Sequence, residues 1–220
     1  MTSMRTRIKI CGLTREADIA AAVQAGADAL GFIFHPGSKR YLAVERAAQL
    51  RREVPAFVDV VALFVNAAPD AIRSVVDHVQ PDLLQFHGDE SPEACRQPGR
   101  RYLRAFRVGA PGLDTPEALA AHCKAYDDAA GWLYDSYSAG YGGSGLAFDH
   151  HLLSAVQADA ASRPLVLSGG LRPESVAQAV RAVRPWAVDV SSGVEIEPGI
   201  KSAERMRAFV AAVREAQIQA

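Results

Sequence analysis

A repeated alternation of short apolar segments with amphipathic segments constrains the fold of this chain more than any other feature. The short segments are rich in Val, Ile, Leu and Phe, which is typical of strands buried on both faces. The segments between them carry apolar residues three and four positions apart, which predicts helices with one buried face. The predicted strands are Arg7–Cys11, Ala29–Phe34, Val58–Val65, Asp82–His87, Tyr102–Val108, Trp132–Asp135, Leu165–Ser168 and Trp186–Val190.

A helix is predicted after each strand, which makes eight strand–helix units. Strand and helix in strict alternation favour parallel strands joined by right-handed crossovers. Eight such units in 220 residues fit a (β/α)₈ barrel of the α/β class near the small end of its size range. An open doubly wound sheet is the alternative, but it usually contains fewer units. Because no linker or compositional break appears, we expect one barrel domain over residues 7–220, preceded by a loose N-terminus at residues 1–6.

The composition narrows the range of partners. Apolar residues make up 49% and charged residues 22% of the chain, and the net charge is −1. These values are ordinary for a soluble globular protein, and no basic face indicates binding to nucleic acid or to a membrane. The three cysteines are not closely paired, which favours a reducing compartment. No signal peptide or membrane-spanning run is visible. We expect a cytoplasmic protein with a small-molecule substrate, either a monomer or a homodimer.

Polar residues gather at the carboxyl ends of the predicted strands. In a closed barrel these ends converge at one mouth, however far apart they lie in the sequence. Side chains alternate along a strand, so Gln85 and His87 share one face, and Ala187 shares one with Asp189. We count Gln85, His87 and Asp189 as candidate substrate-binding residues. A structural role for His87, with its ring nitrogens satisfied within the fold, is about as plausible as contact with substrate.

Cys11 ends the first predicted strand, beside a helix start that Thr14 is expected to cap. A helix N-terminus favours a nearby anion and lowers the pKa of a cysteine, so we expect Cys11 to act as a base or nucleophile. Most free cysteines are small buried apolar residues, and this interpretation is kept for Cys95 and Cys123 on predicted helices.

Asp135 ends the apolar strand Trp132–Asp135 and precedes a glycine-rich loop. Most aspartates in such positions are solvated loop residues or helix caps. A carboxyl group at a barrel mouth is instead a candidate general acid or base, or an electrostatic stabiliser, and the sequence leaves these roles open.

Three glycine-rich segments follow the sixth, seventh and eighth strands. In such barrels the loops after the last two strands commonly bind phosphate, because glycine lets backbone N–H groups approach the oxygens closely. The sequence therefore predicts a phosphorylated substrate, with candidate contacts at Gly142, Gly143, Gly145, Gly169, Gly170, Ser191, Ser192 and Gly193.

Two cationic residues are expected to have specific partners. Arg40, in the loop after the second strand, is a candidate bidentate clamp for a carboxylate. Lys9 shares the inward face of its strand with Cys11, and it is predicted to pair with Asp189 on the neighbouring eighth strand. The alternative is that Lys9 reaches solvent at the bottom of the barrel. No pattern of metal ligands recurs at the strand ends, so no metal is expected.

Six motifs, in order and each at a strand end, together resemble the phosphoribosylanthranilate isomerase family of tryptophan biosynthesis. The sequence departs from the usual family pattern at Tyr134 and Ser202, which are expected to lie on the helix-facing side of a strand and at the start of the last helix. The motifs are Lys9–Thr14, Ser38–Tyr41, Gln85–Gly88, Tyr134–Ser136 with Tyr141–Gly145, Ser168–Leu171, and Asp189–Glu195 with Pro198–Lys201.

The resemblance implies an Amadori rearrangement that requires no cofactor. By analogy with the family, Asp135 would be the general acid that opens the ribose ring, and Cys11 the general base at the second ribose carbon. Arg40 would hold the anthranilate carboxylate, and the glycine loops would hold the phosphate. Two other functions stay open from the residues alone: another sugar-phosphate isomerase or epimerase on the same barrel, and a barrel that binds a phosphorylated ligand without catalysis.

Overall fold

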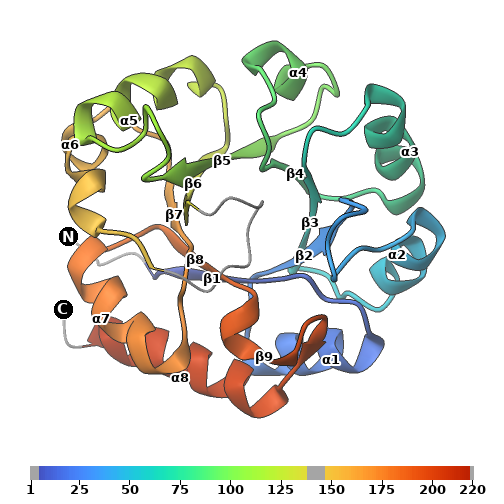
Figure 1. The fold of residues 1–220 in the computed structure, drawn as a ribbon. Helices are drawn as coiled ribbons and strands as arrows, with labels where there is room; N and C mark the ends of the chain where they lie inside the picture. Colours follow the sequence, from blue (N-terminus) through green and yellow to red (C-terminus); the bar gives the residue numbers. More distant parts are fainter. Residues whose placement is uncertain (1–4, 138–146, 219–220) are drawn as a thin grey trace.

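Eight parallel strands form a closed barrel in the order β1 to β8, and the helices surround it as an outer ring (Figure 1). The computed structural model describes residues 5–137 and 147–218. This architecture confirms the predicted single (β/α)₈ barrel. The strands are β1 Arg7–Cys11, β2 Ala29–Ile33, β3 Asp59–Phe64, β4 Leu83–Phe86, β5 Tyr102–Val108, β6 Gly131–Ser136, β7 Leu165–Leu167 and β8 Ala187–Val190.

A helical segment follows every strand of the barrel. The α-helices are α1 Glu16–Ala25, α2 Val44–Arg51, α3 Pro69–Val79, α4 Pro92–Arg96, α5 Pro116–Cys123, α6 Ser154–Ala158, α7 Pro173–Val183 and α8 Ala203–Ile218. Three short 3₁₀ helices accompany them, η1 Lys124–Tyr126, η2 His150–Leu153 and η3 Ser192–Val194. Among the described residues, no helix is both long enough and apolar enough to span a bilayer.

The pairing of β1 with its two neighbours fixes which side chains meet inside the barrel. β8 lies on one side of β1 and closes the barrel, with Lys9 opposite Asp189. β2 lies on the other side, with Cys11 opposite Gly31. Because side chains alternate along each strand, Lys9 and Cys11 share the inner face of β1.

The apolar core lies mainly between the barrel and its helices. Outward-facing strand residues such as Ile10 and Phe64 belong, together with helix residues such as Phe209, to one buried apolar cluster. Tyr134 also faces outward, as predicted: its ring stacks on Phe106, and its hydroxyl lies 3.5 Å from the sulfur of Cys123 on α5. The inner face thus carries the polar and titratable groups of the strand ends.

The structure corrects the predicted helix starts. Helix α1 begins at Glu16 with Arg15 at its N-cap, so Thr14 does not cap it. The Thr14 hydroxyl instead donates a hydrogen bond to the carbonyl oxygen of Gly199, at 2.7 Å. The helical segment between β6 and β7 consists of η2 and the short helix α6.

A two-stranded hairpin between β8 and α8 was not predicted. Its strands are β9 Glu195–Glu197 and β10 Ile200–Lys201, and they pair only with each other. At the other end of the chain, Arg5 pairs with Asp28, and the buried Thr6 hydroxyl donates to the carbonyl oxygen of Pro185. Arg5 and Thr6, which belong to the segment 1–6 that was expected to be loose, are therefore attached to the barrel.

Candidate active site

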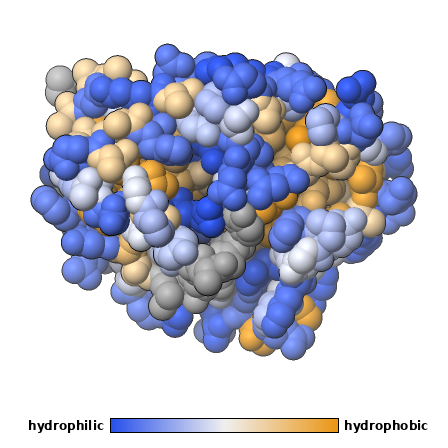
Figure 2. All heavy atoms as spheres, turned by 45° about the horizontal axis from the view of Figure 1, so that its top comes forward, coloured by the Kyte–Doolittle hydropathy of each residue, from blue (hydrophilic) through white to orange (hydrophobic). Residues whose placement is uncertain are grey.

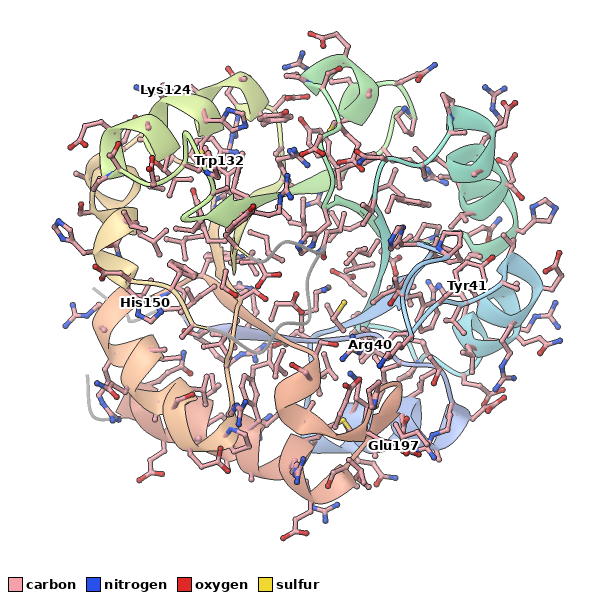
Figure 3. All side chains as sticks on the ribbon, viewed as in Figure 1. Arg40, Tyr41, Lys124, Trp132, His150 and Glu197 are labelled. Carbon is pink, nitrogen blue, oxygen red and sulfur yellow. The ribbon has the colours of Figure 1, made fainter. Side chains whose placement is uncertain are left out.

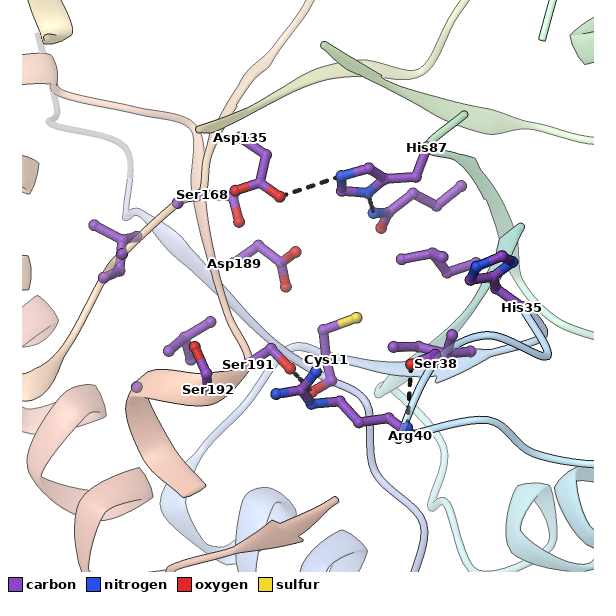
Figure 4. A pocket seen from close by; sticks show the side chains of 18 of the residues that line it. Cys11, His35, Ser38, Arg40, His87, Asp135, Ser168, Asp189, Ser191 and Ser192 are labelled. Carbon is purple, nitrogen blue, oxygen red and sulfur yellow. Dashed lines mark hydrogen bonds and ion pairs between the residues drawn. The ribbon is translucent and has the colours of Figure 1, made fainter. Parts of the chain in front are cut away.

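A pocket opens at the carboxyl ends of the strands and contains most of the residues predicted for the site (Figure 4). The outer surface is largely hydrophilic in the view of Figure 2, with apolar side chains in scattered patches. Gly142, Gly143 and Gly145 lie outside the described residues. The predicted residues that do line the pocket are Cys11, Arg40, Gln85, His87, Asp135, Gly169, Gly170, Asp189, Ser191, Ser192 and Gly193.

The Cys11 thiol is buried at the end of β1, with only 4% of the residue exposed. Gly31 makes room for it, because a Cβ atom at Gly31 would lie 2.6 Å from the Cys11 sulfur. Burial raises the pKa of the Cys11 thiol, and the nearby Lys9 ammonium opposes this shift. The predicted lowering of this pKa by a helix start is therefore wrong in direction, because desolvation outweighs every favourable charge at this position.

Lys9 and Asp189 form the ion pair predicted from the sequence. Lys9 Nζ lies 2.9 Å from Asp189 Oδ1, and the two side chains are only 4% and 6% exposed. Burial by itself would lower the pKa of Lys9, but the attraction of Asp189 and Cys11 outweighs burial and raises it. A fixed cation therefore lies next to the Cys11 thiol.

Asp135 lies at the end of β6 beside His87. Gln85 Nε2 lies 3.0 Å from His87 Nδ1, and because an amide nitrogen can only donate, the imidazole proton belongs on Nε2. That Nε2 atom is 3.2 Å from Asp135 Oδ2. The contact is close but not aligned as a hydrogen bond, since Nε2 has no hydrogen-bond partner among the described residues. The backbone N–H of Ser136 donates to Asp135 Oδ1 at 2.9 Å.

Arg40 makes a bidentate contact with Glu195, a residue to which the sequence had given no role. Its Nε donates to Oε1 at 2.7 Å and its Nη2 to Oε2 at 2.6 Å. Burial opposes ionisation of Glu195, but hydrogen bonds from Arg40 and Lys201 and the charges of both lower the pKa of this carboxyl. In Figure 3, Arg40 lies closer to the barrel axis than Lys124 on the outer ring.

The loops after β7 and β8 pack tightly against their surroundings. Gly169 has a φ of +83°, and a Cβ atom there would lie 2.7 Å from the Ser136 nitrogen. A Cβ atom at Gly193 would lie 2.0 Å from the carbonyl oxygen of Leu171. The backbone N–H groups of Gly169, Gly170, Ser192 and Gly193 donate to no backbone oxygen within the described residues. These loops can therefore present several donors to one anion.

No cluster of three or more histidine, cysteine or acidic side chains that could hold a metal occurs in residues 5–137 and 147–218. The sequence interpretation missed Gly31 and Lys201 as well as Glu195. The turn at Pro198–Gly199 was a visible signal for the hairpin, whereas the partner of Arg40 left no local signal.

A closed (β/α)₈ barrel with a thiol, a carboxyl group and two glycine loops around one pocket defines a barrel enzyme equipped for acid–base chemistry on an anionic ligand. Comparison with known proteins specifies the family. The family model described as N-(5′-phosphoribosyl)anthranilate (PRA) isomerase matches residues 8–212. The chain belongs to the N-(5′-phosphoribosyl)anthranilate isomerase family.

Individual relatives agree with this assignment. The N-(5′-phosphoribosyl)anthranilate isomerase of Bordetella bronchiseptica is 71% identical over 211 residues, which cover 96% of this chain and 97% of that protein. The crystal structure of phosphoribosyl anthranilate isomerase from Thermotoga maritima has a TM-score of 0.85 and 39% identity, covering 96% of this chain and 99% of that one. A phosphoribosyl anthranilate isomerase in complex with reduced 1-(o-carboxyphenylamino)-1-deoxyribulose 5-phosphate has a TM-score of 0.81 and 36% identity, with the same coverage.

The contact between Gly31 and the Cys11 sulfur gives a stability prediction. The variant Gly31→Ala should lower the free energy of unfolding by ~1–3 kcal/mol, as overpacking of a core does. The clash with sulfur should account for part of that loss, since the added Cβ would also lie 3.0 Å from Cys11 Cα and 3.1 Å from Cys11 Cβ. Urea unfolding measures it. In a Cys11→Ala background, which removes the sulfur, Gly31→Ala should lower the free energy of unfolding by a smaller amount. An equal cost in both backgrounds would contradict this explanation.

Proposed function

We propose that the chain isomerises N-(5′-phosphoribosyl)anthranilate to 1-(2-carboxyphenylamino)-1-deoxyribulose 5-phosphate, with Asp135 as general acid and Cys11 as general base. The observation that carries the proposal is the placement of these two groups around one pocket, on β6 and β1 (Figure 4). The family supports the choice of reaction. So does the ligand of the related complex, which is a reduced form of this product.

The first step opens the ribose ring. Asp135 gives its proton to the ring oxygen as the bond between that oxygen and the first ribose carbon breaks. The electrons of the anilino nitrogen form a carbon–nitrogen double bond, which yields a protonated Schiff base. The imidazole of His87, which Gln85 contacts at Nδ1, lies 3.2 Å from Asp135 and limits the positions of its carboxyl group.

The second step moves a proton from carbon to sulfur. The Cys11 thiolate removes the proton of the second ribose carbon, and the released electrons flow towards the Schiff-base nitrogen to give an enolamine. The enolamine then tautomerises to the ketone product. No electrons leave the substrate, so the reaction proceeds without a redox cofactor. Lys9, fixed by Asp189, supplies the positive charge that opposes the burial of the thiolate.

The remaining pocket groups suit the two ends of the substrate. In the loops after β7 and β8, the backbone N–H groups that donate to no backbone oxygen of the described residues would bind the phosphate. Arg40 would bind the anthranilate carboxylate with the part of its guanidinium that Glu195 leaves open. Gln85 Oε1 is buried and has no hydrogen-bond partner among the described residues, so a ribose hydroxyl is a suitable donor to it.

We propose that residues 7–220 act as one catalytic domain, since the barrel begins with β1 at Arg7 and the last helix packs on the same core. We also propose that the protein works in the cytoplasm. The three cysteines, all unpaired and buried, suit a reducing environment.

Replacing either proposed catalytic group should nearly abolish turnover without unfolding the protein. Cys11→Ser and Asp135→Asn should each lower kcat by about 10²–10⁴-fold, the usual contribution of a positioned acid or base. Fluorescence-monitored turnover of phosphoribosylanthranilate measures the loss, and circular dichroism checks the fold. Cys95→Ala, at a buried cysteine outside the pocket, is the matched control and should keep the parent kcat. Turnover near the parent rate in either catalytic variant would disprove the assigned roles.

The ion pair beneath the thiol should control the pH dependence of the reaction. Since burial raises the pKa of Cys11 and Lys9 opposes the shift, activity should rise with pH as the thiolate forms. In Lys9→Met the opposing charge is gone, so the rising limb of the kcat profile should move to higher pH. Lys9→Arg keeps the charge and should leave the limb closer to its parent position. A limb that stays in place in Lys9→Met would show that Lys9 does not act on the thiol.

A further inference from the structure

The β9–β10 hairpin brings two buried charged residues to the edge of the pocket. Glu195 begins β9 and Lys201 ends β10, and the Lys201 side chain is fully buried. The hairpin lies outside the barrel sheet, beside the η3 turn that follows β8 (Figure 1). Its contacts with the site therefore run through side chains rather than through a shared sheet.

Arg40 is held by this hairpin along one edge only. Glu195 binds its Nε and Nη2 atoms, while its Nη1 atom makes no hydrogen bond among the described residues. The stem of Arg40 lies over Gly12, where a Cβ atom would come within 2.5 Å of Arg40 Cδ. A bidentate partner and a packed stem together fix the direction of the open edge.

Lys201 changes the charge balance of this pair. Its Nζ lies 2.8 Å from Glu195 Oε1 and 3.1 Å from the carbonyl oxygen of Ser191. Arg40 and Glu195 alone would be neutral together, so a substrate carboxylate would meet little net charge. Burial lowers the pKa of Lys201, and the charge of Glu195 opposes that shift. While Lys201 is protonated, the group of three carries one excess positive charge in a partly desolvated setting, where such a charge acts strongly.

The same contacts extend to the strand that bears the proposed base. Ser191 Oγ donates to the carbonyl oxygen of Cys11 at 3.0 Å (Figure 4), and Lys201 Nζ lies 3.3 Å from that Oγ. The hairpin is thus connected to Arg40 on one side and to the end of β1 on the other. A hairpin that only closed the surface would not need two buried charges aimed at these residues.

We propose that Glu195 and Lys201 are positioning residues for substrate recognition: Glu195 orients Arg40, and Lys201 offsets the charge of Glu195 so that Arg40 remains effectively cationic toward the substrate carboxylate. The inference rests on the proposed function, since it concerns the end of the same site that would hold the anthranilate group. In this proposal, the combined charges of Arg40, Glu195 and Lys201 let the protein discriminate between ligands with and without a carboxylate.

Two ligands distinguish this role from a structural one. The first is reduced 1-(2-carboxyphenylamino)-1-deoxyribulose 5-phosphate, and the second is its phenylamino analogue without the carboxylate. Titration calorimetry gives the Kd of each ligand for the parent protein and for Lys201→Met. In this variant Glu195 neutralises Arg40 with no compensating cation. The Kd of the carboxylated ligand should therefore rise about tenfold, equivalent to ~1.4 kcal/mol. The Kd of the analogue should change less than about twofold, because the analogue has no carboxylate for Arg40 to bind.

A double variant provides the matched control. Glu195→Gln/Lys201→Met again leaves one excess positive charge, on Arg40, and so should recover much of the lost affinity for the carboxylated ligand. A purely structural hairpin predicts the opposite, since the second change would add to the damage of the first. Steady-state kinetics should show a raised KM in Lys201→Met. The rising limb of its kcat profile should also move to higher pH, because the charge of Lys201 helps to lower the pKa of Cys11.

The outcomes separate this inference from the proposed function. If the parent protein binds the carboxylated ligand no better than the analogue, the proposed substrate is wrong and the inference falls with it. If the parent protein binds the carboxylated ligand better than the analogue, but Lys201→Met weakens the binding of both ligands equally, only the proposed role of the hairpin is wrong. The same holds if the double variant binds the carboxylated ligand more weakly than the single one. Unfolding midpoints of both variants, compared with the parent, show whether the weakening reflects loss of fold.

Discussion

The ion pair between Lys9 and Asp189 is the interaction on which the proposed chemistry of this barrel depends. It joins β1 to β8, the two strands that close the barrel, and both side chains are almost fully buried. Burying two charges is costly, and a buried pair adds little to stability by itself. Its effect is to hold an ammonium group beside a thiol whose pKa burial would otherwise raise further. The pair links closure of the fold to the charge of Cys11.

Cations concentrate on the Cys11 side of the pocket rather than around Asp135. Lys9, Arg40 and Lys201 all act electrostatically on the thiol. Asp135, in contrast, is contacted by the imidazole of His87 and by a backbone N–H. This asymmetry suits the proposed roles, since a base that must lose its proton gains from nearby cations, whereas an acid that must donate does not.

The parts of this site that follow local rules could be predicted from the sequence. Period two along strands, together with the neighbour relation of the first and last strands in a closed barrel, was sufficient to pair Lys9 with Asp189. The position of Asp135 followed from the end of an apolar strand. The direction of the Cys11 pKa shift could not be predicted, because it depends on how completely helices and loops exclude water. The contact of Arg40 with Glu195 spans 155 residues and left no periodic signal.

The β9–β10 hairpin carries residues that bear on the proposed recognition of the substrate carboxylate but that the sequence did not single out. Its strands Glu195–Glu197 and Ile200–Lys201 are too short to produce an alternation, so their residues were read only as part of a motif. Yet a bidentate arginine already bound to a glutamate is a poor carboxylate receptor unless a further charge compensates the glutamate. Lys201 is placed to supply that charge. In the proposed site, recognition of the carboxylate therefore depends on three side chains rather than on Arg40 alone.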